Sequence, residues 1–261
     1  MSFASCIAYS IKKDIKVELV RLNDWGQVVG DDLPNWNERN LPEKKVLKGR
    51  YCHLEPLTIE KHGRHLFEAF SKVNNDSLWT YLPLEPFCDY AVFSEVFGKK
   101  SNANDEIHYA IINPESGLPI GTIALIRTDN RNGSTEIGYV IYSPQLQRTV
   151  MSSEAQFLLM RYVFNDLKYR RLEWKCDSLN EPSKRAAERL GFHFEGTFRN
   201  ALVYQGRTRD TDWYSITDYE WPTMCSGFEE WLSSENIVEG KQIKGLRDIR
   251  ETLAKMREKK L

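Results

Sequence analysis

The sequence has little cysteine, no excess of charge of either sign and no long apolar run. Its cysteines are scattered along the chain and form no C-x-x-C or Cys/His cluster (Cys6, Cys52, Cys88, Cys176, Cys225). Neither a zinc site nor a disulfide framework is therefore expected, and reduced, buried thiols are the simplest interpretation. The 36 basic and 37 acidic residues leave a formal net charge of −1, which gives no electrostatic basis for binding nucleic acid.

No segment approaches the roughly 18 consecutive apolar residues of a membrane span. The first ten residues lack the basic leader and cleavage site of a signal peptide. These absences predict a cytoplasmic protein with no metal and with neither a membrane nor a nucleic acid as partner. The chain has 261 residues, of which 41% are hydrophobic and 12% aromatic, which is ample for a large core.

Proline and composition divide the chain into three parts. Residues 1–45 are predicted to form an N-terminal arm, because their second half is polar and interrupted by proline. Residues 46–222 form the main domain, which Pro222 closes. Residues 223–261 form a C-terminal tail of two helices, at 228–232 and about 241–259. The second carries one short apolar stripe (Leu246, Ile249, Leu253, Met256), which favours a tail packed on its own domain over a coiled coil.

The stretch 135–194 is the most informative part of the sequence. Residues 135–142 are β-branched and aromatic and predict a strand. Apolar residues spaced near 3.6 predict a helix over 151–167, with Ser152–Glu154 as capping and acidic residues at its start. Residues 171–176 predict a buried strand, and 183–190 a helix that Gly191 ends in the left-handed conformation. A strand, helix and parallel strand form a right-handed crossover unit.

Hairpins flank this crossover. Strands are predicted at 108–113 and 119–128 before it, joined by turns at 113–117 and 129–133, and at 196–204 and 211–219 after it. Further helices are predicted from Thr58 and over 90–97. The resulting fold class is α/β, with a mixed, mostly antiparallel twisted sheet and helices on both faces.

The mouth of the crossover is a candidate anion site. The strand's carboxyl end meets a helix N-terminus, whose backbone N–H groups lack partners within the helix. Arg148 adds a cation in the connecting turn. From these residues alone, a purely structural crossover with a solvated arginine explains the pattern equally well.

Four segments resemble the GNAT N-acetyltransferases, in particular the branch of the ribosomal-protein alanine acetyltransferases. Residues 180–192 resemble the signature N-x-x-S-x-x-x-x-E-x-x-G-F. Residues 136–139 resemble the strand before that family's coenzyme A loop, 153–155 its T-E-A helix start, and 194–199 the strand after the signature. The resemblance covers roughly residues 46–222 and rests on the order and spacing of the set. It implies an acetyl-CoA-dependent N-acetyltransferase.

The resemblance also implies a set of site residues. The coenzyme A site would comprise backbone and side-chain groups of Tyr139, Val140, Ile141, Gln147, Arg148, Thr149, Val150, Met151, Ser152, Ser153, Asn180 and Ser183. Ser183 is a candidate acid for the leaving thiolate, although it is also a plausible helix N-cap. Glu136, at the base of the first crossover strand, is a candidate proton acceptor or, equally, a structural carboxylate. Trp79, Tyr81 and Phe87 would line the acceptor pocket or pack beneath a loop.

The phosphate loop departs from the family pattern Q/R-x-x-G-x-G/A, because residues 147–152 contain no glycine. Glycine there allows close approach of the backbone to a pyrophosphate. Such a loop can still present its N–H groups if Thr149 and Val150 keep negative φ values.

The expected function is transfer of an acetyl group from acetyl-CoA to a primary amine of a small molecule or of a protein N-terminus, by a monomer or homodimer. Charges on the last hairpin bear on the acceptor (Arg199, Arg207, Arg209, Asp210, Asp212): inward acids favour a cationic amine, and inward bases a carboxylate-bearing one. The alternative, which the glycine-free loop motivates, is a non-catalytic acyl-CoA-binding or protein-interaction module on the same fold.

Overall fold

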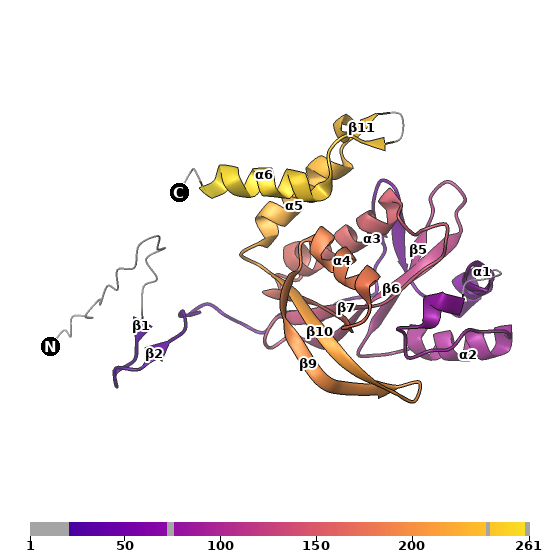
Figure 1. Cartoon of the computed structure of the whole chain (residues 1–261), viewed down its shortest axis with the longest axis horizontal. Helices are drawn as coiled ribbons and strands as arrows, with labels where there is room; N and C mark the ends of the chain where they lie inside the picture. The colour runs from indigo at the N-terminus through magenta and orange to yellow at the C-terminus, as the bar shows by residue number, and fades with distance from the viewer. Residues whose placement is uncertain (1–20, 72–75, 239–240, 259–261) are drawn as a thin grey trace. The chain divides into compact units, whose positions relative to one another are not determined.

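The computed structural model describes residues 21–71, 76–238 and 241–258 (Figure 1). The chain divides into two units, residues 1–37 and 38–261. In the first unit, β1 (Arg21–Leu22) pairs with the antiparallel β2 (Val28–Val29). The remainder of the predicted arm before Arg21 lies outside the described residues.

The second unit is built on an eight-stranded sheet in the order β3-β4-β5-β6-β7-β8-β10-β9. Its strands are β3 (Leu47–Lys48), β4 (His53–Pro56), β5 (Ile107–Ile112), β6 (Pro119–Asp129), β7 (Ser134–Tyr142), β8 (Arg171–Asp177), β9 (His193–Tyr204) and β10 (Arg207–Thr217). Only β7 and β8 are parallel neighbours in this sheet, and every other adjacent pair is antiparallel. The predicted mixed, mostly antiparallel sheet is confirmed.

Helices cover both faces of this sheet (Figure 1). They are α1 (Arg64–Phe70), α2 (Tyr90–Ser101), α3 (Val150–Arg161), α4 (Glu181–Leu190), α5 (Trp221–Leu232) and α6 (Leu246–Glu258), with short helical turns η1 (Ile59–Gly63), η2 (Asp76–Trp79), η3 (Tyr162–Asp166) and η4 (Ser234–Asn236). Ala110 and Ile112 of β5 pack in one core with α1 and α2. Tyr109 and Ile111 pack in a second core with α3, α4 and α5. Since alternate residues of a strand point to opposite faces, the two cores lie on opposite sides of the sheet.

The crossover elements lie where the sequence predicts them, with shifted ends. α3 begins at Val150, because Thr149 caps it by accepting the Ser152 N–H, and its last turn widens into the π-helical η3. α4 begins at Glu181 rather than Ser183, because Asn180 is the cap. Gly191 ends α4 at φ 107°, as predicted.

The tail helices are where the sequence prediction is wrong. α5 begins at Trp221 instead of 228, since Pro222 lies in the first helical turn, where a missing N–H costs nothing. A short hairpin of β11 (Ile237–Val238) and β12 (Lys241–Gln242) precedes α6, so α6 begins at Leu246 instead of about 241. Among the helices of the described ranges, none combines the length and apolar character that a membrane crossing needs.

Candidate active site

The two parallel strands part in the middle of the sheet. β7 pairs with β8 from Ser134–Arg171 to Ile137–Trp174 and no further, although both strands continue. Backbone groups of β7 beyond Ile137 on this side are therefore open to a ligand between the strands. Tyr139, Val140 and Ile141, which the resemblance implies for the coenzyme A site, lie in this stretch of β7.

A bulge in β7 lies at the opening. On the β6 side, Ala124 pairs with Gly138 but Thr122 pairs with Ile141, so the ladder is out of register between them. Tyr139 takes up the difference at φ 47°, a conformation unusual for a residue with a side chain. Such a bulge re-aims side chains and backbone amides, and here it does so where the strands part.

The turn between β7 and α3 is built without glycine. Leu146 is fully buried and anchors it, and the Gln147 side chain donates to the Tyr142 carbonyl at 2.9 Å. The left-handed position falls on Arg148, at φ 60°. Thr149 keeps φ at −100° and Val150 is helical. Both Gln147 and Arg148 are exposed, so the guanidinium is accessible at the helix N-terminus.

The side chains in the first turn of α3 point into the protein. Ser152 bonds the Thr149 carbonyl at 2.7 Å, and Ser153 accepts a hydrogen bond from Arg189 of α4 at 2.8 Å. Only the backbone of this turn is therefore suited to an external anion. The amides of Val150 and Met151 have no acceptor inside the helix, because it begins there.

Glu154 has a function that the sequence did not reveal. Its buried carboxylate accepts the backbone N–H groups of Arg50, Tyr51 and Cys52 at 2.7–2.8 Å. It thereby fixes the β3–β4 turn against α3. Burial, with the Glu154 charge beside it, raises the pKa of the Cys52 thiol well above its usual range, so this thiol stays protonated. The sequence indicated only an acid favourable to the helix dipole.

Ser183 lies across the opening, in the first turn of α4. Asn180 accepts the Ser183 N–H at 3.2 Å and is the N-cap, so the prediction of Ser183 as a possible cap is wrong. The Ser183 hydroxyl accepts a hydrogen bond from the Trp174 indole at 2.9 Å. Because the indole can only donate, the hydroxyl proton of Ser183 points elsewhere. Burial raises the pKa of the adjacent Cys176 thiol to about 11.

Glu136 is held between two cations. Its carboxylate lies 2.8 Å from Arg127 and 2.9 Å from Lys175, and it is almost fully buried. Lys175 in turn pairs with Glu173 at 2.7 Å and lies over the Trp213 ring at 3.8 Å. This arrangement favours the structural interpretation of Glu136 over that of a proton acceptor.

Two of the three aromatic residues predicted for the acceptor pocket lie at accessible positions. Trp79 is only 3% exposed and packs in the core with Phe70 and Phe87. Phe87 borders a hollow of about 430 Å³ beside α2. The Tyr81 hydroxyl donates to the Leu179 carbonyl of the β8–α4 loop at 3.0 Å, which brings the 76–89 loop to the end of β8.

The β9–β10 hairpin completes this side of the opening. The Gln205 side chain donates to the Leu82 and Leu84 carbonyls at 3.0 and 2.9 Å, and the Tyr204 hydroxyl donates to Asp177 at 2.8 Å. Asp212 is buried on the hairpin and accepts from Thr197 at 2.6 Å. Of the charged residues expected to decide the acceptor, Asp212 is thus already bonded within the protein.

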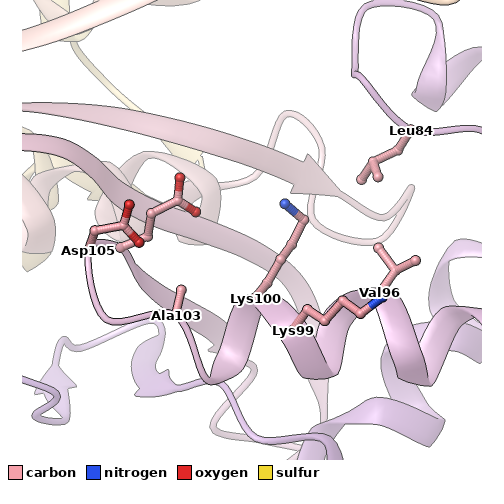
Figure 2. Close-up of a pocket in the computed structure, with 7 residues that line it drawn as sticks. Leu84, Val96, Lys99, Lys100, Ala103 and Asp105 are labelled. Atoms are coloured by element: carbon pink, nitrogen blue, oxygen red, sulfur yellow. The ribbon is translucent and has the colours of Figure 1, made fainter.

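A second hollow adjoins the first on the α2 face of the sheet. It measures about 310 Å³ and shares Leu84 and Val96 with its neighbour. Figure 2 shows its lining residues, which also include Lys99, Lys100, Ala103, Asp105 and Glu106.

His108 is the titratable group in this region that the sequence did not single out. It is buried on β5, its Nε2 lies 2.7 Å from Glu106, and its ring lies 5.1 Å from that of Tyr139. Burial chiefly, together with the charges of Lys100 and Lys44, lowers its pKa despite Glu106. A histidine inside a strand gives no local signal, because its environment comes from α2 and β7. Within the described residues no group of three or more His, Cys, Asp or Glu could hold a metal.

The comparisons with known proteins agree with this architecture. Residues 53–193 match the family model described as an acetyltransferase (GNAT) domain. A GCN5-related N-acetyltransferase from Brucella melitensis is 44% identical, with a TM-score of 0.82 over 84% of this chain and 100% of that one. YjcK of Bacillus subtilis (strain 168), named a probable N-acetyltransferase, is 26% identical over 63% of this chain and 93% of its own.

A more distant structure shares the fold alone. The spermidine N-acetyltransferase of Vibrio cholerae, solved with CoA and spermine, is 20% identical, with a TM-score of 0.53 over 65% of this chain and 96% of that one. The chain belongs to the GNAT acetyltransferase family, and the resemblance seen in the sequence is confirmed. It is an acetyltransferase.

Proposed function

We propose that the protein binds acetyl-CoA between β7 and β8 and transfers the acetyl group to a primary amine. One observation carries the proposal: pairing of the two strands stops at Ile137–Trp174, and Tyr139 forms a bulge at that point. The bulge and the open edge of β7 offer backbone amides to a thioester oxygen and an amide-containing arm.

The residues present fit the phosphate end of acetyl-CoA. Arg148 supplies the left-handed residue that the turn needs, so glycine is not required for the chain to enter α3. Its exposed guanidinium and the free amides of Val150 and Met151 form a cationic and dipolar site for a pyrophosphate. Gln147, Thr149, Ser152 and Ser153 shape the turn through contacts within the protein.

Ser183 is suited to protonate the leaving sulfur. Acetyl transfer needs a proton for the thiolate. The hydroxyl of Ser183 accepts from Trp174 and turns its own proton toward a sulfur, that of Cys176, which a leaving thiolate would replace as acceptor. Asn180 fixes this first turn of α4 by capping it. Glu136 contributes by holding Arg127 and Lys175 in place below the opening.

We further propose that the catalytic domain spans residues 46–222, that the tail packs on it, and that the enzyme acts in the cytoplasm. The relatives' names support amine acetylation in general, and a polyamine acceptor is a property of the Vibrio cholerae enzyme. The joined hollows along α2 support an elongated acceptor that enters beside Phe87.

Calorimetric titration of acetyl-CoA into the wild type and Arg148→Ala tests the binding site. We expect micromolar affinity in the wild type, weakened about tenfold or more in the variant, because one charge-assisted phosphate contact is lost. Arg247→Ala, an exposed arginine on α6, is the matched control and should leave the affinity unchanged. No heat and no thermal stabilisation by millimolar acetyl-CoA would reject the site and favour a non-catalytic module.

A further inference from the structure

We propose that Lys100 occupies the position of the acceptor amine and that the enzyme transfers an acetyl group to this lysine of its own chain. The inference rests on the acetyl-CoA site proposed above. It adds a modification site on α2 and assigns the removal of the amine proton to His108.

The Lys100 side chain lies beside the bulge of β7. Lys100 lies in the last turn of α2, and its Nζ is 3.4 Å from the centre of the Tyr139 ring. Tyr139 forms the bulge at which β7 and β8 part. A primary ammonium therefore already lies beside the proposed transfer point, held by the electron-rich face of an aromatic ring.

Lys100 contrasts with its neighbour in sequence. Lys99 is exposed and pairs with Glu95 at 2.7 Å on the surface of α2. Lys100 is half-buried, and no carboxylate within the described part of the chain forms an ion pair with it. In Figure 2 the Lys100 side chain rises from the helix, whereas Lys99 runs along it toward Val96. The two lysines are thus a matched pair in different surroundings.

A proton acceptor lies beside the same ring. The Glu106 carboxylate can only accept, so the imidazole Nε2 of His108 carries the hydrogen of their 2.7 Å bond. Nδ1 then carries the free lone pair. Burial, Lys100 and Lys44 keep the pKa of His108 low, so that the imidazole is neutral near pH 7.

The transfer step balances with these groups. The Lys100 ammonium loses one proton to solvent, and its nitrogen then attacks the thioester carbonyl carbon while Nδ1 of His108 takes a second proton from it. A carbon–nitrogen bond forms and the carbon–sulfur bond breaks. The sulfur takes a proton from the Ser183 hydroxyl, which regains one from solvent, while His108 releases its proton to solvent.

The same geometry names a class of external acceptor. A lysine side chain is a primary amine on an unbranched aliphatic stem, and the wall beside Lys100 offers apolar Leu84 and Val96. Alkyl amines and lysine side chains of other proteins share this chemistry. Acetylation of Lys100 would remove its charge and weaken its contact with Tyr139, which would leave the ring to an external amine.

Mass mapping of the purified protein after incubation with acetyl-CoA alone tests the proposal. We expect Lys100 to be acetylated at least about tenfold faster than Lys99, and about tenfold or more slower in His108→Gln. Below the pKa of His108 the wild-type rate should fall by more than about tenfold per pH unit, because the neutral amine and the neutral imidazole are both lost. In His108→Gln it should fall only about tenfold per pH unit, because only the amine is titrated.

A second readout needs no acetyl-CoA. The imidazole titration of His108, followed by NMR, should move to higher pH in Lys100→Met, because a nearby positive charge is removed. Lys99→Met is the control and should leave this titration in place.

The outcomes separate the two proposals. Absence of calorimetric binding of acetyl-CoA rejects the proposed function. Two results overturn this inference alone if acetyl-CoA binds. In the first, Lys100 is acetylated no faster than Lys99. In the second, the rate of Lys100 acetylation and its pH dependence are the same in His108→Gln as in the wild type. An unchanged pKa of His108 in Lys100→Met also overturns this inference.

Discussion

At the scale of single residues, the site depends on side chains whose partners come from distant parts of the chain. Ser183 is fixed by Trp174, nine residues earlier on another element. Glu154 is bonded to amides about a hundred residues before it. These contacts decide which chemically capable groups are free to act and which are occupied.

The hydroxyl of Ser183 is expected to act on the leaving group. Ser183→Ala should lower kcat by about tenfold or more and leave the affinity for acetyl-CoA nearly unchanged, because proton donation matters in the transition state. Steady-state kinetics with calorimetry on the same variant measures both. Ser183→Thr keeps a hydroxyl and should retain more activity than alanine; equal loss in the two variants would indicate a packing role.

Glu154 is expected to contribute to stability. Glu154→Gln should lower the free energy of unfolding by about 2–4 kcal/mol, since an amide cannot accept all three N–H groups that the buried carboxylate accepts. Urea denaturation gives the difference. Glu68→Gln, on the exposed face of α1, serves as the control, and an equal small effect in both would contradict the assignment.

The ion pair of Glu195 predicts a pH dependence. Arg171 donates to this carboxylate at 2.7 Å and lowers its pKa. The stabilisation is therefore present above the unfolded-state pKa of about 4.3 and is lost as pH falls through the lower folded value. Unfolding measured between about pH 3 and 6 should be less pH-dependent in Glu195→Gln. If the stability of the wild type and of Glu195→Gln changes in parallel with pH, the ion pair does not contribute to the pH dependence.

At the scale of elements, the sequence predicted the helices and strands whose positions are encoded by local residue patterns. The β7–α3–β8–α4 order followed from residue spacing, and the end of α4 from Gly191. The bulge at Tyr139 and the meeting of His108, Lys100 and Tyr139 had no local signal. The bulge arises from the pairing of β6 with β7, and the meeting from packing between β5, α2 and β7. Trp79 gave the right chemistry for a pocket wall but lies in the core, since only the tertiary structure decides its burial.

The junction of α4 with the tail offers a test of element packing. An added Cβ at Gly191 would lie 2.0 Å from the Arg250 guanidinium, and φ is 107°. Gly191→Ala should therefore destabilise the protein by more than about 1 kcal/mol. At Gly206 φ is positive but an added Cβ would meet no atom, and at Gly196 φ is not positive and an added Cβ would also meet no atom. Thermal unfolding of the three should follow that order; equal effects at 191 and 206 would exclude the contact with Arg250.

At the scale of the whole molecule, the proposed function depends on the opening between β7 and β8, where we propose that acetyl-CoA binds. Composition and charge gave no basis for expecting a nucleic-acid-binding or membrane-spanning protein, and the spaced motifs indicated the family. The acceptor could not be predicted from the sequence, because the place proposed for it depends on α2, the 76–89 loop and the last hairpin, which meet only in the folded chain.

Hydrogen–deuterium exchange with and without acetyl-CoA tests that claim most directly. We predict slowed exchange at residues 138–142, at 147–153 and in the first turn of α4, with β3 and α6 unchanged. Protection confined to other segments, or no protection at a ligand concentration that stabilises the protein against heat, would contradict it.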